Sequence, residues 1–204
     1  LSRGEFEQKI SQCSVPAETV VHGPFLSNPA ERSMTISWET AGMSAGILEY
    51  RKKGEQEWRA FPVGISNGIL SGNQKFHAAH LNGLEPGNDY EYRLVNLTMQ
   101  KKQHYLFPAE GTFSFRTLNP AKREFSFAVC SDIHSDVKTL KQLLTLPEMK
   151  NTDFLVNLGD MLSRMAGPDS FHDGFLDLET ELYAKYKPLV FVRGNHEQLG
   201  LFAA

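Results

Sequence analysis

The chain has 204 residues, a formal net charge of -3 and a pI near 6.2, with 41% hydrophobic and 22% charged residues. This length allows one large domain or two small ones, and the composition is that of an ordinary globular protein. The lack of a basic excess argues against a general binder of nucleic acid or anionic membranes, because these partners favour a positively charged surface. No run of about 18 apolar residues is present, so no membrane span is expected.

Residues 1–19 lack hydrophobic periodicity and are expected to form a leader or edge segment. The first ten residues, LSRGEFEQKI, contain no apolar core of a signal peptide, so any export signal has been removed or lies outside this sequence. Cys13 lies in this polar segment and Cys130 in an apolar run. A disulfide between them is therefore not expected, and Cys130 is interpreted as a small buried hydrophobe.

Residues 20–118 consist of short alternating runs separated by Gly, Pro and Asn turns, which is typical of an antiparallel β-sandwich. The alternation predicts that Trp38 is a core anchor. His77, His80 and the tyrosines are interpreted as core and strand residues, with a carbohydrate- or ligand-binding stripe as the alternative. Asn96 begins a glycosylation sequon, which matters only in a eukaryotic secretory context.

Residues 119–123 form a short polar linker, after which alternation gives way to strands interleaved with helices. Strands are predicted at 125–130, 154–158 and 189–193, and the first is interpreted as buried on both faces. A β-α-β-α-β order with short links predicts a parallel sheet with right-handed crossovers.

Two helices are predicted between these strands. The first ends before Pro147, and Ser170 with Asp173 could cap the start of the second. Each helix has an apolar stripe, formed by Val137, Leu140, Leu143 and Leu144 in the first and by Phe171, Phe175, Leu178 and Leu182 in the second.

Each predicted strand of the second region ends in polar residues suited to metal binding. Asp132 and His134 follow the first strand, Asp160 the second, and Asn195 and His196 the third. Because parallel strands bring their carboxyl ends to one edge of the sheet, these side chains are expected to converge there. Carboxylate, imidazole and amide donors suit Fe, Mn, Zn or Mg, whereas a soft-metal site needs thiolates.

Three motifs in this order resemble the calcineurin-like metallophosphoesterase superfamily: D-x-H at residues 132–134, G-D at 159–160 and G-N-H-E at 194–197. In the first region, residues 81–92 resemble the E to F corner of fibronectin type III domains, with Tyr90 as the corner tyrosine. The stretch VHGPFLSNPAERSMTISWET also resembles the N-terminal domain of purple acid phosphatases.

The resemblance implies a two-domain protein of the purple acid phosphatase type. An all-β fibronectin-III-like sandwich would span residues 20–118 and a linker 119–123. The N-terminal part of a metallophosphoesterase domain would span 124–204, as the parallel β-α-β-α-β portion of an αββα sandwich.

The same resemblance implies a role for each motif residue. Asp132 and His134 would hold one metal, Asp160 would bridge two metals, and Asn195 would hold the second. The cofactors would be two divalent or trivalent ions, Fe, Mn or Zn, which make hydroxide available for in-line attack on a phosphate ester. His196 would contact the substrate phosphate and assist the leaving group.

Three further positions bear on this assignment. Arg164 falls where related phosphoprotein phosphatases keep a phosphate-binding arginine, with a solvated loop arginine as the alternative. Purple acid phosphatases have glycine where His134 stands and tyrosine where Ser163 stands, so the resemblance to them covers the domain arrangement and not the first metal's ligands. The family's remaining ligands are three histidines downstream of G-N-H-E, so the chain is expected to be part of a longer enzyme and inactive alone.

The leading expectation is a binuclear metal-dependent phosphoesterase, exported by family resemblance. The alternative is a non-catalytic binding or adhesion protein with a β-sandwich module and a remnant α/β domain. A nucleotide-binding or receiver-like domain is disfavoured because no glycine-rich loop follows the first strand. The substrate and the oligomeric state stay open.

The remaining charged residues and histidines match no motif. They are interpreted as surface residues, with the acids on the polar side of a helix. This set comprises His104, His172, Asp169, Asp173 and Glu179.

Overall fold

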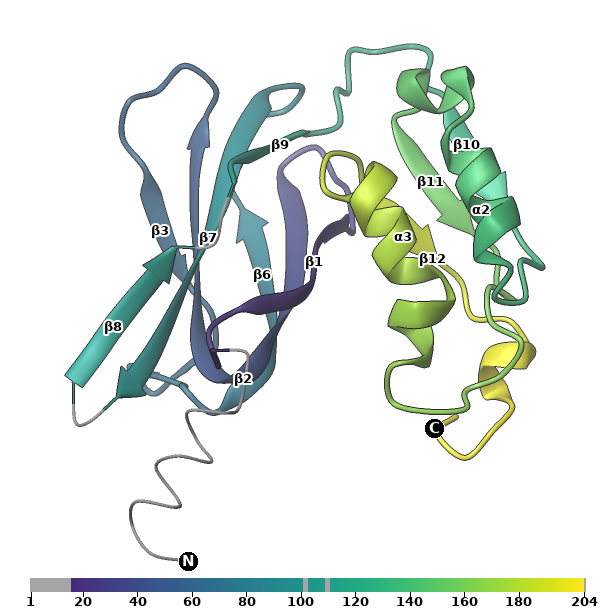
Figure 1. Cartoon of the computed structure of the whole chain (residues 1–204). Helices are drawn as coiled ribbons and strands as arrows, with labels where there is room; N and C mark the ends of the chain where they lie inside the picture. Colours follow the sequence, from purple (N-terminus) through teal and green to yellow (C-terminus); the bar gives the residue numbers. More distant parts are fainter. Residues whose placement is uncertain (1–15, 101–102, 109–110, 204) are drawn as a thin grey trace, which may run out of the picture.

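The structure, a computed structural model, describes residues 16–100, 103–108 and 111–203. Cys13, and with it the expectation about a disulfide, lies outside the described residues, as does the side chain of His104. The described chain forms two units that lie side by side, an all-β sandwich followed by an α/β unit (Figure 1).

The sandwich is organised around one long strand, β2 (Ser33–Lys52). Its first half pairs with β6 and its second half with β7, and the register shifts between Glu39 and Ser44. One strand therefore contributes to both layers. The other strands are β1 (Val20–Ser27), β3 (Arg59–Pro62), β6 (Gln74–Asn82), β7 (Asp89–Gln100), β8 (Gln103–Pro108) and β9 (Phe113–Arg116), with a small hairpin of β4 (Ile65–Ser66) and β5 (Ile69–Leu70).

Trp38 lies at the centre of the sandwich core and is fully buried, as predicted. Its indole N–H donates to Asn96 Oδ1 at 3.0 Å, and the Asn96 amide donates to the Glu18 carbonyl at 2.9 Å. Asn96 is also fully buried, so the folded sandwich has no room for a glycan on the sequon asparagine.

The two histidines of β6 point in opposite directions. His77 is buried, and desolvation lowers the pKa of its imidazole to about 4. His80 is exposed, and its Nδ1 lies 2.8 Å from the Thr35 hydroxyl. Because side chains alternate along a strand, this pattern places His77 in the core and His80 on the sheet surface.

The corner before β7 has the geometry that the sequence predicts for Tyr90. The Glu85 backbone N–H donates to the Tyr90 hydroxyl at 2.8 Å. The Tyr90 ring is buried and stacks on Phe115 with ring centroids 5.5 Å apart. The tyrosine therefore fixes the turn to the core through both its ring and its hydroxyl.

The α/β unit has the predicted parallel sheet, with strands in the order β10, β11, β12. Asp136 caps the helix that follows β10, accepting from the Lys138 and Thr139 backbone N–H groups. The elements of this unit are β10 (Phe127–Cys130), α2 (Val137–Leu144), η1 (Pro147–Asn151), β11 (Phe154–Asn157), η2 (His172–Leu176), α3 (Asp177–Glu179), η3 (Thr180–Ala184), β12 (Leu189–Phe191) and η4 (His196–Gln198).

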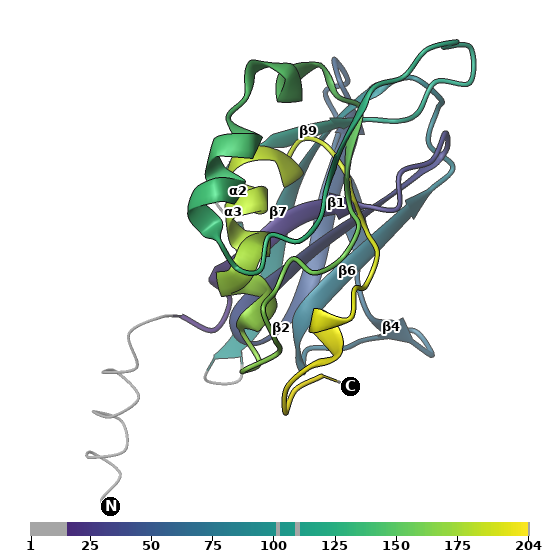
Figure 2. The ribbon, with the colours of Figure 1, turned by 90° about the vertical axis from the view of Figure 1, so that its right-hand side faces the viewer.

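Two expectations about the ends and faces of these elements are wrong. The first strand is not buried on both faces, because Phe127 and Val129 are about half exposed, at 49% and 51%. Both helices lie on the same side of the parallel strands (Figure 2). Ser170 does not cap the second helical segment, since its hydroxyl instead accepts from the Gly167 N–H at 2.8 Å.

The second helical segment differs from the regular amphipathic helix that was expected. It contains two π-helical turns, η2 and η3, on either side of the short α3. The predicted apolar stripe still faces the core, where Phe175 is buried and Phe171 packs beside it. Glu179, predicted on the polar side, is instead fully buried.

The two units share one sheet. Ser27 of β1 pairs in parallel with Leu189 of β12, so the parallel strands continue into the sandwich. The buried Tyr92 hydroxyl donates to the Lys185 carbonyl at 2.8 Å, and Phe25 packs against the α/β core. These contacts fix the direction in which the α/β unit faces.

No helix in the described residues is long and apolar enough to cross a membrane.

The tyrosine corner gives a stability prediction. Tyr90→Phe removes the acceptor of the Glu85 N–H and should lower the free energy of unfolding by about 1 kcal/mol, the net value of one such hydrogen bond. Urea denaturation measures the change. Tyr50→Phe is the matched control, because Tyr50 packs beside the same core and its hydroxyl makes no hydrogen bond with the described residues. Equal effects of the two substitutions would show that the corner bond is not stabilising.

Candidate functional site

The loops that follow the three parallel strands are joined to one another by backbone hydrogen bonds. Asp132 N–H donates to the Gly159 carbonyl at 3.2 Å, and His134 N–H donates to the Asp160 carbonyl at 3.0 Å. These bonds place the first two motifs side by side.

Several residues of these loops have backbone conformations that L-amino acids rarely adopt. Asp132, His134 and Asp160 have φ values of 57°, 50° and 52°, and Ser135 has a φ of 63°. Such left-handed conformations cost about 1–3 kcal/mol each when they occur in non-glycine residues. They persist only where surrounding contacts hold them, and they are common at functional sites.

Glu197 supplies contacts of this kind from beneath the loops. Its side chain is fully buried, and its carboxylate accepts three backbone N–H bonds. Oε2 accepts from Asp160 at 2.9 Å and from Gly194 at 2.8 Å, while Oε1 accepts from Leu162 at 3.0 Å. Hydrogen bonds to a carboxylate are about twice as strong as neutral ones. Glu197 therefore ties the second and third motifs together.

The glycines of these two motifs are required by close packing. A Cβ atom at Gly159, whose φ is +88°, would collide with the Gly194 backbone. A Cβ atom at Gly194 would collide with the Asp160 backbone and carboxylate. Only glycine lets the two loops approach this closely.

Three of the predicted side chains form a compact donor group. His134, Asp160 and His196 each offer one donor atom, and these atoms lie within 4.8 Å of one another. The rings of His134 and His196 meet edge to face, with centroids 4.3 Å apart. Asp132 lies beside them, with its Oδ1 3.9 Å from His134 Nε2.

The orientations of Asp160 and His196 are set by the backbone. Asp160 Oδ1 accepts the His196 backbone N–H at 2.8 Å. His196 Nδ1 donates to the Ser163 carbonyl at 2.9 Å, and the Ser163 hydroxyl donates to the His134 carbonyl at 2.6 Å. This arrangement leaves Nε2 of His196 available for a ligand or for proton transfer.

The other two predicted residues, Asn195 and Arg164, are exposed and are not part of the donor group. Asn195 is exposed at the start of η4, and Arg164 is exposed in the loop after β11. Neither side chain makes a hydrogen bond with the described residues. Arg164 lines a shallow hollow of about 570 Å³ together with Ser135 and Ser163, so it lies next to the donor group.

A polar trio lies behind the strand ends. Asn157 and Glu179 are buried, whereas Cys130, expected to be a buried hydrophobe, is only partly buried and makes a polar contact. Asn157 donates to both carboxyl oxygens of Glu179, at 3.0 and 2.9 Å, and accepts from the Cys130 thiol at 3.0 Å. Desolvation raises the pKa of Glu179 to about 8 and that of Cys130 to about 12. The Cys130 thiol thus belongs to this trio and is not part of the donor group.

The donor set suits the metals of a phosphoesterase. Carboxylate and imidazole groups converge at the carboxyl edge of a parallel sheet, whereas the Cys130 thiol donates to Asn157 instead. Borderline and hard ions such as Zn, Mn and Fe prefer this chemistry. The residues present thus fit the ions that the motifs imply.

Sequence reasoning missed the role of Glu197. It appeared only as the last letter of the G-N-H-E motif and received no function of its own. The sequence did contain a signal, namely an acidic residue directly after the motif histidine. If such a residue is buried, its carboxylate needs hydrogen-bond donors nearby.

Comparisons with known proteins agree with this geometry. Residues 125–203 match the family model described as calcineurin-like phosphoesterase, and residues 22–117 match that of the purple acid phosphatase N-terminal domain. These matches confirm the resemblance inferred from the motifs. Two successive parts of the chain are therefore similar to a purple acid phosphatase N-terminal domain and to calcineurin-like phosphoesterases, in that order. A search of curated proteins finds no match.

One solved structure has a similar fold, and a second is less similar. The structure of PhoD matches with a TM-score of 0.54 and 16% identity, and the match covers 92% of this chain and 40% of that chain. This chain therefore spans less than half the length of PhoD. A fibronectin type III domain of human fibronectin type III domain containing protein 3 matches with a TM-score of 0.36 and 13% identity over 54% of this chain and 94% of its own.

Glu197 gives the first prediction for the site. Glu197→Gln replaces one acceptor oxygen by a donor that faces backbone N–H groups, and should lower the free energy of unfolding by about 2–3 kcal/mol. Guanidinium denaturation measures this loss. Glu181→Gln, the same change at an exposed helical acid, should have almost no effect. Equal stability of the two variants would contradict the role assigned to Glu197.

Glu179 gives a prediction about pH. Because its pKa is raised to about 8, the folded protein keeps a proton that the unfolded chain releases near its ordinary pKa of 4.5. The stabilising contribution is complete below about pH 4.5 and is lost as pH rises through about 8. Glu179→Gln should therefore gain stability relative to wild type between pH 5 and pH 8, by more than about 1 kcal/mol. Parallel stability curves for the two proteins would show that Glu179 titrates normally.

Proposed function

We propose that this chain contributes to the catalytic site of a binuclear metal-dependent phosphoesterase that hydrolyses phosphate esters. The observation that carries the proposal is the convergence of His134, Asp160 and His196, beside Asp132, on loops that the buried Glu197 holds together. The match to the calcineurin-like phosphoesterase family supports the reaction class.

The proposed metal ligands follow the motifs. Asp132 and His134 would hold one ion, Asn195 the other, and Asp160 would bridge them. Bound metals of this kind polarise phosphoryl oxygens and lower the pKa of a coordinated water, which makes hydroxide available near neutral pH. By resemblance to the family, we propose that histidines outside this chain complete the ligand set, so the chain alone would be inactive.

His196 is proposed to act on the substrate. Its Nδ1–H is bonded to the Ser163 carbonyl, which holds the ring beside Asp160 and His134. In the imidazolium form, Nε2–H would donate to a phosphate oxygen and give its proton to the leaving oxygen. Arg164, at the adjacent hollow, is a second candidate for contact with the phosphate.

Export to the periplasm or the extracellular space is also proposed. It is supported by the match to the purple acid phosphatase N-terminal domain, since proteins of that type are often extracellular.

Asp160 should be the most damaging single position. In the protein expressed from its complete reading frame, Asp160→Asn should reduce metal content and phosphatase activity together, because one carboxylate is proposed to contact both ions. Metal analysis and hydrolysis of p-nitrophenyl phosphate and its diester, with Mn²⁺, Zn²⁺ or iron, measure both effects. Asp89→Asn, at a partly exposed aspartate of β7 in the sandwich, is the control. Two retained metals with near-normal turnover would remove the bridging role.

His196 separates chemistry from metal retention. His196→Ala in the same protein should keep both metals and lower kcat by roughly 10²- to 10⁴-fold, the usual contribution of a general acid or base. The geometry also permits His196 to be a metal donor, so metal analysis of this variant decides between the two roles. Loss of metal with unchanged activity per remaining metal pair would assign His196 as a ligand.

A further inference from the structure

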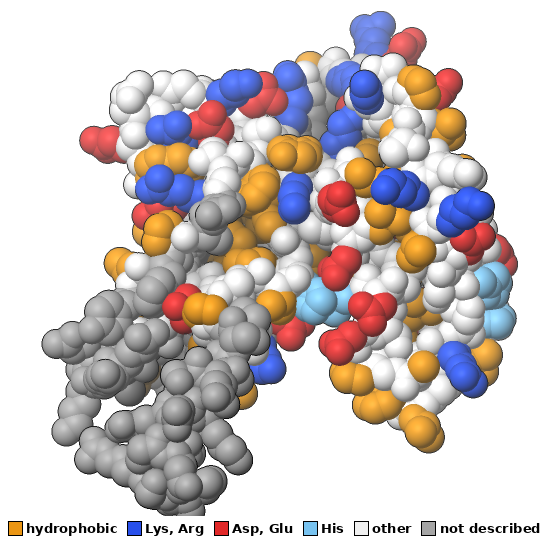
Figure 3. Space-filling model, viewed as in Figure 1, with side chains coloured by type: hydrophobic (Ala, Val, Ile, Leu, Met, Phe, Trp, Pro, Cys, Tyr) orange, Lys and Arg blue, Asp and Glu red, His pale blue; other side chains and the backbone are white. Residues whose placement is uncertain are grey.

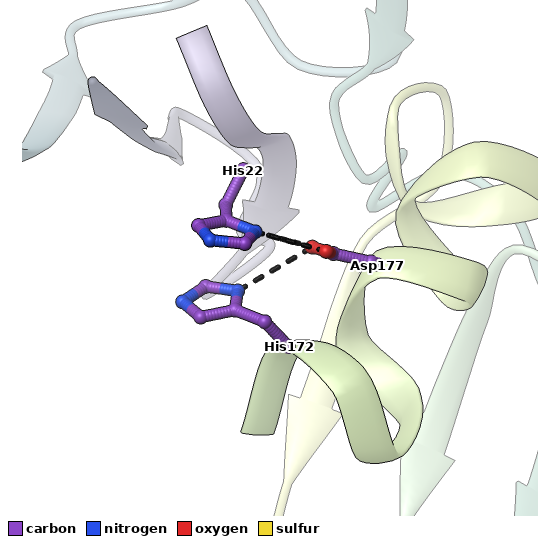
Figure 4. A group of neighbouring side chains, drawn as sticks. All are labelled: His22, His172 and Asp177. Atoms are coloured by element: carbon purple, nitrogen blue, oxygen red, sulfur yellow. Dashed lines mark hydrogen bonds and ion pairs between the residues drawn. The ribbon is translucent and has the colours of Figure 1, made fainter. Parts of the chain in front are cut away.

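A second group of histidine and acidic side chains lies away from the strand ends, at the junction of the two units. It consists of His22 on β1, His172 on η2 and Asp177 on α3 (Figure 4). Figure 3 shows histidine and acidic side chains gathered along this junction. His172 was expected to be a surface residue, but only 14% of its side chain is exposed.

The fold places these residues together from both sides. On the sandwich, His22 is the direct cross-strand partner of Glu39. On the α/β unit, the Asp177 backbone N–H donates to the His172 carbonyl, which closes a π-helical turn. A π turn brings residues five apart onto the same face, and such turns are frequent at functional sites.

Two of the three spacings between donor atoms are close to those around a tetrahedral ion. Asp177 Oδ1 lies 3.1 Å from His22 Nδ1 and 3.4 Å from His172 Nδ1. With metal–ligand bonds of about 2.0–2.1 Å, neighbouring ligands of Zn²⁺ are roughly 3.3 Å apart. The three donor atoms all lie within 4.8 Å of one another.

The remaining ring nitrogen of His172 has a carboxylate beside it. Glu39 Oε2 lies 3.5 Å from His172 Nε2. A carboxylate at that nitrogen favours the tautomer with the proton on Nε2, which leaves the Nδ1 lone pair free for a metal. His172 Nδ1 is itself buried and has no hydrogen-bond partner among the described residues.

We propose that His22, His172 and Asp177 form a zinc site that links the sandwich to the α/β unit, with Glu39 orienting His172. Two imidazoles and a carboxylate are a ligand set of catalytic-type zinc sites, in which water takes the fourth position. Asp177 is 42% exposed at its side chain, which leaves one side of the site open to water. The two carboxylates would balance the charge of the ion.

Coordination requires one adjustment of the side chains. The His22 and His172 rings stack with centroids 3.6 Å apart and an angle of 15° between their planes. An imidazole binds a metal ion through a lone pair in its ring plane. To bind one ion together, the two rings must therefore rotate about their Cβ–Cγ bonds out of the stacked arrangement.

Zinc titration by calorimetry at pH 7.5 tests the proposal. The titration uses a background that carries His134→Gln and Asp160→Asn, so that binding at the strand ends is weakened. This background should still bind one zinc ion per chain. Glu39→Gln should weaken that binding by roughly 10- to 100-fold, as expected for loss of an orienting carboxylate. His172→Gln should weaken it further, and His80→Gln, at an exposed histidine of β6, should not change it.

Absence of saturable zinc binding in the background protein would overturn the proposal. So would equal affinities of the His172→Gln and His80→Gln variants. Circular dichroism checks that each variant is folded. If His172→Gln does not fold, the zinc affinity of Asp177→Asn tests the site instead. Asp177 is partly exposed, and asparagine removes its charge while keeping the shape of the side chain. Unchanged zinc affinity in Asp177→Asn would equally overturn the site.

Discussion

The buried Glu197 carboxylate is the contact on which the strand-end site depends. It accepts backbone N–H groups of Asp160, Leu162 and Gly194, which belong to loops more than thirty residues apart in sequence. The bond to Asp160 helps to hold the left-handed backbone of that residue. Side-chain donors can converge only because the loops are held close enough, and the two motif glycines remove the Cβ atoms that would keep them apart.

The sandwich matters to this site because the two units share a sheet. The pairing of β1 with β12 continues the parallel strands, and the Tyr92 hydroxyl binds the helical segment that precedes β12. The orientation of β12, and with it Asn195 and His196, is therefore tied to the sandwich core. A zinc ion at His22 and His172 would strengthen the same junction. The N-terminal domain thus acts as a support for the strand-end site and not as a separate appendage.

Much of this arrangement could be predicted from sequence, because it follows from local patterns. Alternation gave the sandwich and Trp38 in its core, and the strand-end motifs gave the donor residues. The errors concern tertiary contacts. Glu179 falls on the polar side of the predicted helix, but it is buried and accepts a hydrogen bond from Asn157. His172 was expected on the surface, but it contacts Glu39 of the sandwich. The first strand was predicted to be buried on both faces, but Phe127 is half exposed, because burial depends on which layers cover the sheet.

Metal-edge anomalous diffraction tests the central claim most directly. Crystals of the protein expressed from its complete reading frame, grown with Mn²⁺ or Zn²⁺, should show two anomalous peaks about 3.5–4 Å apart at the strand ends. Asp160 should lie between the peaks, with Asp132 and His134 on one and Asn195 on the other. Peaks at this edge that do not contact Asp160, or an edge with no metal beside an intact Glu197 cluster, would contradict the account.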